Sequence, residues 1–355
     1  MGTRMSATVA LGNARTPRVT VLMGVHNGER FLAEALDSIL AQTFRDFEVL
    51  IIDDASTDRT ASILADYTSR HACIHLMRNT SNLGLTRTLN IGLAAARGEY
   101  IARMDADDTA FPERIARQVA FLDMHPEVGV LGTGAALMNA DGTILRERHC
   151  ATDHEAIAWR LFFTNDLIHT SVLFRSHIVG EPVRYDEAVR RAQDHALWLR
   201  LCRVTRLAVL PEVLVHYRIH TDNITTTDAG GVDASSAAQA ARSAAEYLGR
   251  DVDIADMMVL RAPERCTQDP HPASRLRSAA GVLQDLHDAY VRTHHISGAA
   301  APCIRRDMAR RLLDLAWTAC HVVPGTALWT ALAAFRHDPS LLRFALWRWR
   351  HGEER

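Results

Sequence analysis

Residues 18–52, RVTVLMGVHNGERFLAEALDSILAQTFRDFEVLII, decide the fold class of this 355-residue chain. The stretch begins and ends with apolar runs, Arg18–Val25 and Phe47–Ile52, that have the length and composition of buried strands. Between them, apolar side chains recur at helical spacing, which predicts a helix with one face packed on a sheet. These side chains are Phe31, Leu32, Ala35, Leu36, Ile39 and Leu40.

The same alternation continues along the chain. Residues 56–58 can cap a second helix, and a strand is predicted near Ile74–Met77. A third helix is predicted from Thr86, and Gly98 could close it before the next strand, Tyr100–Met104. The order β-α-β-α-β-α-β predicts an α/β fold with a Rossmann-like, mostly parallel sheet and flanking helices.

Composition and charge limit the possible functions. With 48% hydrophobic and 23% charged residues, the chain can form one sizeable domain plus a smaller appendage. The formal net charge of −2 gives no reason to expect a nucleic acid partner. No apolar run approaches the roughly 20 residues of a membrane span, so we expect a soluble or peripheral protein.

The basic residues and the cysteines narrow the chemistry further. All 40 basic residues are Arg, which removes mechanisms that need an amine, such as Schiff-base formation or the Lys of a Walker loop. The six Cys are scattered without a close pair, which argues against a zinc site or a disulfide framework. We therefore expect reduced thiols in a cytoplasmic protein.

Three carboxylates fall within four residues directly after the predicted strand that ends at Met104. They belong to Asp105, Asp107 and Asp108, and they would repel one another. In open α/β sheets such loops bind ligands, so a divalent cation, Mg²⁺ or Mn²⁺, would explain the cluster. The alternative is a solvated acidic turn that caps the next helix, although a cap needs only one acid.

Two earlier loops carry polar residues suited to a nucleotide. Asp53 and Asp54 end the second strand beside the loop after the first, where a carboxylate can accept a hydrogen bond from a base N–H. Asp54 could instead cap the following helix. Asn82 and Gly84 precede the third helix, where a Gly permits close approach of a ligand to the backbone. The alternative for these two residues is a plain turn.

Taken in order, these motifs resemble family 2 glycosyltransferases of the GT-A fold over residues 17 to about 225. The matching segments are residues 24–29 (GVHNGE), 36–44 (LDSILAQTF), 51–58 (IIDDASTD), 82–85 (NLGL) and 89–90 (LN), followed by the acidic cluster at the family's DxD position. The resemblance implies that His26, where the family commonly has an aromatic residue, contacts the nucleotide. It also implies that Asp54 contacts uracil and that Asp105 belongs to the donor site.

A later motif supplies a candidate base. Residues 193–195 (QDH) precede an apolar helix start, so Asp194 lies at or near a helix N-terminus. In the family the acid of this motif is the catalytic base, which implies that Asp194 takes the proton of the acceptor hydroxyl. Two alternatives remain: Asp194 is a simple N-cap, or His195 is the base, although its side chain should point elsewhere.

Two segments complete the resemblance. Residues 215–220 (VHYRIH) resemble the family's YRxH segment, which implies that Arg218 and His220 neutralise pyrophosphate oxygens when a loop closes. His216 is as suited to packing. Residues 169–175 (HTSVLFR) resemble a strand that lines the acceptor side.

The resemblance implies a metal-dependent, inverting enzyme. It would transfer a hexose-type sugar from a nucleotide diphosphate sugar, with a UDP-sugar favoured, to a hydroxyl of a glycan or glycolipid, as in cell-surface polysaccharide synthesis. Two rivals fit parts of the pattern. Residues 105–109 (DADDT) also resemble the DxDxT motif of haloacid dehalogenase phosphatases, which place it on the first strand and usually use a Lys. A non-catalytic nucleotide-sugar-binding scaffold is the second.

The predicted domains are a flexible N-terminus (1–16), a GT-A domain (17–225) and a helical C-terminal region (226–355). The composition shifts to Thr, Asp, Gly and Ser after about Thr221, which predicts a linker between the GT-A domain and the helices. Residues 346–350 (LWRWR) mix Trp with Arg, which suits peripheral contact with the inner face of a membrane. The alternative is a helical extension that packs on the domain or on a second subunit of a homo-oligomer.

Overall fold

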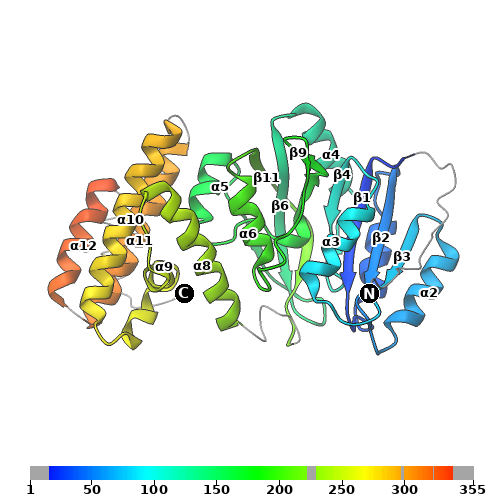
Figure 1. Cartoon of the computed structure of the whole chain (residues 1–355), viewed down its shortest axis with the longest axis horizontal. Coiled ribbons are helices and arrows are strands. Elements are labelled where there is room, and N and C mark those ends of the chain that lie inside the picture. Colours follow the sequence, from blue (N-terminus) through cyan, green and yellow to red (C-terminus); the bar gives the residue numbers. More distant parts are fainter. Residues whose placement is uncertain (1–15, 222–228, 297–299, 323, 339–355) are drawn as a thin grey trace, which may run out of the picture.

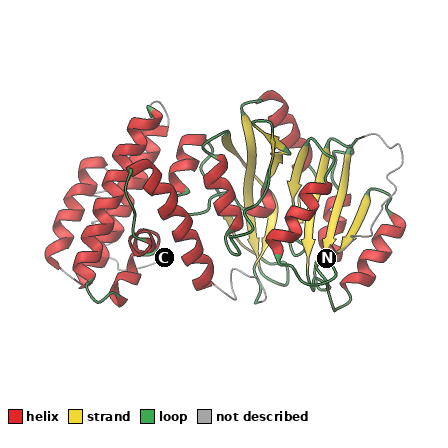
Figure 2. Cartoon of the chain, viewed as in Figure 1, coloured by secondary structure: helices red, strands yellow, loops and turns green. Residues whose placement is uncertain are grey.

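The computed structural model describes residues 16–221, 229–296, 300–322 and 324–338. A twisted sheet with helices on both faces forms the first part of the chain, and a group of helices forms the second (Figures 1 and 2). The predicted α/β class, the mostly parallel sheet and the helical C-terminal extension are confirmed.

Within the described residues, nine strands form the main sheet in the order β3-β2-β1-β4-β8-β6-β11-β5, with β7 paired to β6. Their bounds are β1 Val19–Val25, β2 Phe47–Asp53, β3 Ile74–Arg78, β4 Tyr100–Arg103, β5 Thr109–Ala110, β6 Val128–Met138, β7 Ile144–Arg148, β8 Leu173–Arg175 and β11 Arg206–Arg218. The strands β3, β2, β1 and β4 run parallel, as do β6 and β11. The strand β8 runs antiparallel between β4 and β6. A small hairpin pairs β9 His177–Ile178 with β10 Glu181–Pro182.

Helices cover both faces of the sheet. On one face of the sheet pack α1 Leu32–Leu40, α2 Thr60–Arg70 and α4 Arg114–Met124. On the second face pack α3 Leu85–Ala95, α5 His154–Arg160 and α6 Gln193–Leu201. Every residue of β1 is buried, because a parallel strand covered on both faces needs a continuous apolar run. This is the pattern that residues 18–52 display in the sequence.

The C-terminal helices continue the second core. They are α8 Ala229–Leu248, α9 Ile254–Arg261, α10 Pro272–His294, α11 Ala300–Val322 and α12 Pro324–His337. Trp159 of α5 is fully buried and packs 5.6 Å, between ring centroids, from Tyr290 of α10. Its Nε1 donates a hydrogen bond to Asp307 of α11 at 2.8 Å. One apolar core therefore joins these helices to the sheet, and the domain limits at 16 and 225 stay a prediction.

Residues 346–350, the Trp- and Arg-rich end of the predicted membrane-contacting region, lie outside the described residues. Among the helices that are described, none is both long and apolar enough to cross a bilayer.

Gly98 does not close α3, so that prediction is wrong. The helix ends at Ala95, and the cap residue Ala96 is already extended. Gly98 instead passes against β1, where its N–H donates to Thr20 Oγ1 at 2.9 Å. A Cβ at Gly98 would lie 2.4 Å from the backbone nitrogen of Thr20. A glycine is needed here for close approach of two backbones.

We expect Gly98→Ala to lower the free energy of unfolding by about 2 kcal/mol or more, because the backbone of a central strand cannot move aside. Urea unfolding followed by circular dichroism measures this. Gly281→Ala in α10 is the matched control, since a Cβ there meets nothing within 4 Å. It should raise the stability by roughly 0.5–1 kcal/mol, the helical advantage of Ala over Gly. A Gly98→Ala protein as stable as the wild type would contradict the packing argument.

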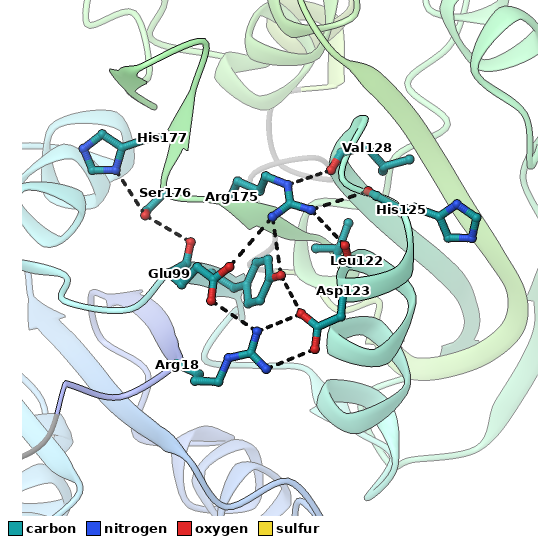
Figure 3. A network of polar contacts seen from close by, with 10 residues as sticks. Arg18, Glu99, Leu122, Asp123, His125, Val128, Arg175, Ser176 and His177 are labelled. Carbon is teal, nitrogen blue, oxygen red and sulfur yellow. Dashed lines mark hydrogen bonds and ion pairs between the residues drawn. The ribbon is translucent and has the colours of Figure 1, made fainter.

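The amino ends of the strands are fixed by a polar network (Figure 3). Arg18 donates to both carboxylate oxygens of Asp123 at 2.7 and 3.0 Å and to Glu99 at 3.2 Å. Arg175 of β8 donates to the carbonyl of Leu122 at 2.8 Å. These contacts tie β1, β4, β8 and α4 together at the edge opposite the loops that carry the predicted site residues.

Candidate functional site

The predicted site residues gather at the carboxyl edge of the sheet. The strand β1 pairs in parallel with β2 on one side and with β4 on the other. The loops after these strands therefore emerge together, and they carry His26, Asp54 and residues 105–108, here called the acidic loop. After β1 the chain adds β2 and β3 on one side of it and then crosses to add β4 on the other side. The edge between β1 and β4 is therefore a topological switch point, the place where open α/β sheets bind ligands.

Asp54 organises the loop before α3. It is 3% exposed, and its Oδ1 accepts hydrogen bonds from Leu83 N at 2.9 Å and Asn79 Nδ2 at 2.7 Å. Its Oδ2 accepts from Gly84 N at 2.9 Å, and the Asn82 side chain accepts from the same N–H at 3.0 Å. Gly84 has φ 82°, so the glycine is required by its backbone conformation. A Cβ at Gly84 would meet no protein atom within 4 Å, so the backbone there is open, and the approach of a ligand to it stays a prediction.

Asp54 does not cap α2, so that alternative is wrong. Thr60, the first residue of α2, donates its backbone N–H to Asp58 Oδ1 at 2.9 Å instead. His26 lies beside Asp54 with an exposed ring, and its Nδ1 is 2.8 Å from the Asp54 carbonyl oxygen. A carbonyl only accepts, so Nδ1 carries the proton in this contact. The loops after β1 and β2 thus present an exposed ring beside a buried carboxylate.

The acidic loop meets the end of β11 through β5. The strand β5 follows the loop directly and pairs antiparallel with β11. His216 of β11 contacts Thr109 Oγ1 at 2.9 Å and lies 4.5 Å, between ring centroids, from Phe111, which supports its packing role. This pairing brings Arg218 and His220 beside the acidic loop.

Two of the three carboxylates of the acidic loop are paired with basic side chains. Asp105 accepts a hydrogen bond from Arg103, which is completely buried beneath the loop. Asp107 Oδ2 lies 3.0 Å from His220 Nε2. Burial raises the pKa of Asp107 and the nearby charge of Asp105 adds to it, whereas the contact with His220 opposes the rise.

The third carboxylate, Asp108, is buried and only half satisfied. It is 1% exposed, and its Oδ1 accepts from Arg218 N at 2.7 Å. Its Oδ2 is buried and has no hydrogen-bond partner among the described residues. Burial and the charges of Asp107 and Asp105 raise the pKa of Asp108 well above its usual range. Such an oxygen is costly unless a proton or a cation compensates it.

The buried side chain of Arg218 contacts the backbone of the acidic loop. Its side chain is 2% exposed, its Nε donates to the Asp107 carbonyl at 2.8 Å, and its Nη2 donates to Glu34 of α1 at 2.7 Å. The guanidinium also lies 4.5 Å from the ring centroid of Phe31, which in turn is 5.1 Å from the His220 ring. For both basic residues, a contact with pyrophosphate stays a prediction.

The donor set of the acidic loop fits a hard divalent cation. The part-exposed carboxylate of Asp107 and the unpaired oxygen of Asp108 are the ligand type that Mg²⁺ prefers. No three His, Cys, Asp or Glu side chains in the described ranges are arranged to hold a metal. Mg²⁺ needs no such cluster when one or two carboxylates share it with substrate phosphates and water.

Asp194 lies in the first turn of α6, as predicted. The N-cap position is occupied by Ala192 and no side chain caps the helix, so the reading of Asp194 as a simple N-cap is wrong. Asp194 Oδ2 accepts a hydrogen bond from Asn165 Nδ2 at 2.6 Å. Burial raises the pKa of Asp194, hydrogen bonds from the His195 backbone N–H and from Asn165 oppose the rise, and the negative charge of Asp105 adds to it. The acidic loop and Asp194 contact the same segment, because Asp105 N donates to Thr170 Oγ1 and Asn165, five positions earlier, donates to Asp194.

His195, the alternative base, points into the core. It is completely buried, and its Nε2 is 2.6 Å from the Leu161 carbonyl. Burial lowers the pKa of His195 to about 4. A ring enclosed in this way does not reach the carboxyl edge, so Asp194 is the better candidate.

The segment expected to be an acceptor-side strand is only partly a strand. Residues His169–Ser171 form a single 3-10 turn, and β8 follows it. The turn supports the acidic loop, because Thr170 Oγ1 accepts from Asp105 N at 3.1 Å. The His169 ring contacts the Tyr185 hydroxyl at 2.8 Å.

Sequence reasoning missed two buried cations and one amide at this site. Arg103 contacts Asp105, and Arg114 of α4 donates to the Arg103 carbonyl at 2.8 Å. Burial and the nearby charge of Arg103 lower the pKa of Arg114 to about 9. A lone Arg in the apolar run directly before the acidic loop was a readable signal for Arg103. Asn165, the partner of Asp194, had no comparable signal.

Comparison with known proteins agrees with the geometry. Residues 20–172 match the model of glycosyl transferase family 2. EpsE of Bacillus subtilis is 44% identical over 187 residues, which are 52% of this chain and 66% of that protein. The O-antigen biosynthesis glycosyltransferase WbnJ of Escherichia coli is 30% identical over 207 residues, 57% of this chain and 80% of its own. An uncharacterized glycosyltransferase of Methanocaldococcus jannaschii is 30% identical over 213 residues, 59% and 73% respectively.

Solved structures share the fold along almost the whole chain. Staphylococcus aureus TarS 1–349 in complex with UDP-GlcNAc has a TM-score of 0.55 at 17% identity, covering 95% of this chain and 92% of that one. The mannosyltransferase PcManGT from Pyrobaculum calidifontis in complex with GDP-Man and Mn²⁺ has a TM-score of 0.52 at 18% identity, covering 92% and 87%. The expected GT-A fold is confirmed, with a C-terminal helical extension.

Proposed function

Because the chain belongs to glycosyltransferase family 2, we propose that it transfers a hexose-type sugar, with inversion, from a UDP-sugar to a hydroxyl of a glycan or glycolipid. The proposal places it in cell-surface polysaccharide synthesis, which the similarity to an O-antigen biosynthesis enzyme supports. The observation that carries it is the position of the acidic loop. It emerges beside the loops after β1 and β2, and it shares with Asp194 a contact to the segment 165–170.

The nucleotide would lie against the loops after β1 and β2. A carboxylate has about four lone-pair sites, and the Asp54 carboxylate uses three of them on the loop before α3. The remaining site could accept the N–H of uracil, with the exposed His26 ring beside the base. Asn82 and Gly84 would form the wall of the same site through the backbone that Asp54 orients.

The diphosphate would lie at the acidic loop. Asp107 and Asp108 would hold Mg²⁺ or Mn²⁺, which supplies positive charge to offset the charge of the departing nucleoside diphosphate. Asp105, already paired with Arg103, would accept hydrogen bonds from donor hydroxyls. His220 and Arg218, which contact the acidic loop, would add positive charge near the diphosphate.

Asp194 would act on the acceptor. An uncharged alcohol is a poor nucleophile, so a carboxylate that removes its proton accelerates attack. Burial raises the pKa of Asp194 toward the working pH, which makes it a stronger base than an exposed Asp. Attack from the face opposite the leaving group inverts the anomeric configuration, and the site contains no second acid assigned as a nucleophile.

The pH dependence follows from this role. Only the ionised form of Asp194 accepts a proton, so kcat should fall as the pH is lowered through its pKa. Because burial raises that pKa, the acid limb should lie above about 3.9, the value for an exposed Asp. Saturating-donor kinetics between about pH 4.5 and 8, with folding checked by circular dichroism, measure the limb. A kcat that rises on acidification would contradict the assignment.

A screen of nucleotide sugars with Mn²⁺ tests the donor assignment. A bound donor stabilises the folded state by mass action, so one UDP-sugar should raise Tm the most. The same donor should release UDP only when an acceptor is added. Tight binding without turnover in any acceptor mixture would favour the scaffold alternative. The phosphatase alternative is wrong, because the family is a glycosyltransferase family and the DxDxT segment follows β4 instead of β1.

A further inference from the structure

One neighbouring amide holds the carboxylate of the proposed base. Asn165 lies between α5 and the turn at 169–171, and its Nδ2 donates to Asp194 Oδ2 at 2.6 Å. Within the described part of the chain, no other side chain is recorded as a donor to this carboxylate. The contact joins segments 29 positions apart in the sequence.

The segment that carries this amide is fixed from three sides. Arg148 of β7 donates to the Asn165 carbonyl at 2.6 Å, and Cys150 Sγ contacts the Asp166 carbonyl at 2.7 Å. Arg160 of α5 forms an ion pair with Asp166 at 2.5 Å. These contacts limit the movement of the Asn165 backbone.

The Asn165 side chain makes its contact at a cost. Its Oδ1 is buried and has no hydrogen-bond partner among the described residues. Leaving a buried acceptor unpaired costs roughly 1–3 kcal/mol in typical proteins. A buried amide with a purely structural role usually has partners for both its oxygen and its nitrogen. In Asn165 only the nitrogen has one, and that partner is Asp194.

We propose that Asn165 is the positioning residue of the base, holding Asp194 by Oδ2 so that Oδ1 is left to receive the proton of the acceptor hydroxyl. This inference rests on the proposed function. A neutral amide suits the task, because it donates to the ionised carboxylate but cannot itself take up the proton. It also keeps Asp194 a usable base, since a full positive charge in the same place would lower the pKa of the carboxyl much further.

Other groups act on Asp194 as well. The backbone N–H of His195 also donates to its carboxylate and favours the ionised form. The negative charge of Asp105 favours the neutral form, and the charge of Asp194 in turn acts on Tyr185, from the segment before α6. Burial raises the pKa of Tyr185 above the range of the measurement, so Tyr185 stays neutral throughout. The hydrogen bond from Asn165 opposes the effects of burial and of Asp105.

The test is the pH profile of kcat for Asn165→Leu, which keeps the side-chain volume and removes the donor. The acid limb should move to higher pH by about one unit, as expected for losing a hydrogen bond to a charged group. The kcat at pH 7 should fall on the order of tenfold through misplacement of the base, while KM for the donor stays unchanged. Asn165→Asp, a near-isosteric second variant, should move the limb in the same direction, because a like charge disfavours ionisation of Asp194.

Two comparisons make the result decisive. Cys150→Ala removes one backbone contact of the same segment and leaves the Arg148 contact and the Asn165 amide in place, so its acid limb should stay at the wild-type pH. Asp194→Asn is measured in parallel. If it is inactive while both Asn165 variants keep the wild-type limb, the positioning role is overturned and the proposed base survives. If Asp194→Asn is active, the base assignment itself is overturned.

Discussion

Replacing Asp194 with Asn is expected to lower kcat for sugar transfer by about 10² to 10⁴, the usual contribution of a positioned general base. The amide keeps the shape of the side chain and its place in the first turn of α6, but it cannot accept a proton. The proposed donor site lies on the loops after β1, β2 and β4, away from Asp194, so the Kd of the nucleotide sugar should stay within about twofold. Steady-state kinetics and calorimetric titration of the same preparations measure the two quantities.

The matched control is Asp153→Asn. Asp153 is a true N-cap residue, since its carboxylate accepts from Ala156 N at 3.1 Å at the start of α5. Asn caps a helix about as well as Asp, so this variant should keep both its stability and its kcat. A near-wild-type kcat in Asp194→Asn would show that the base is another group.

Removing the metal should have the second large effect. A chelator is expected to abolish transfer and to weaken UDP binding, because the diphosphate would then face the carboxylates of the acidic loop without a cation between them. Asp107→Asn removes one proposed ligand and should lower kcat/KM on the order of 10² to 10³, the equivalent of several kcal/mol of charge stabilisation. Unlike Asp194→Asn, it should also weaken metal-dependent donor binding.

Asp66→Asn is the control for Asp107→Asn. Asp66 is an exposed acid on α2 that pairs with Arg70 within the same helix. Its loss should change neither the donor Kd nor the metal dependence, because a surface ion pair of this kind contributes little. Full activity of the wild type in excess chelator, unchanged when metal is added back, would contradict the metal assignment.

The first half of the sheet was readable from the sequence because its strands are short, apolar and separated by amphipathic helices. Residues 18–104 gave β1 to β4 and α1 to α3 within a few positions at each end. The second half was not readable. The strand β6, VGVLGTGAALM, is buried along its whole length and so lacks the alternation of a half-buried strand, and it pairs with β11 about 80 residues away. The two-residue strand β5 gives no periodic signal at all.

The site was predictable where it depends on strand ends and was not where it depends on packing. The acidic loop and Asp54 follow parallel strands, so their common edge is implied by topology. The contacts of Arg218 with Glu34, 184 positions away, and of Asp194 with Asn165 arise only when helices and strands pack. Gly98 shows the same limit, because its neighbour on β1 decides its role.

The stereochemistry of the product tests the central claim most directly. If Asp194 deprotonates the acceptor for a single displacement at the carboxyl edge of the sheet, an α-linked UDP-sugar must give a β-linked product. Proton NMR of the anomeric hydrogen in the purified product distinguishes the two linkages. We predict β-linked product with one UDP released for each sugar transferred. An α-linked product would contradict direct displacement and the role given to Asp194.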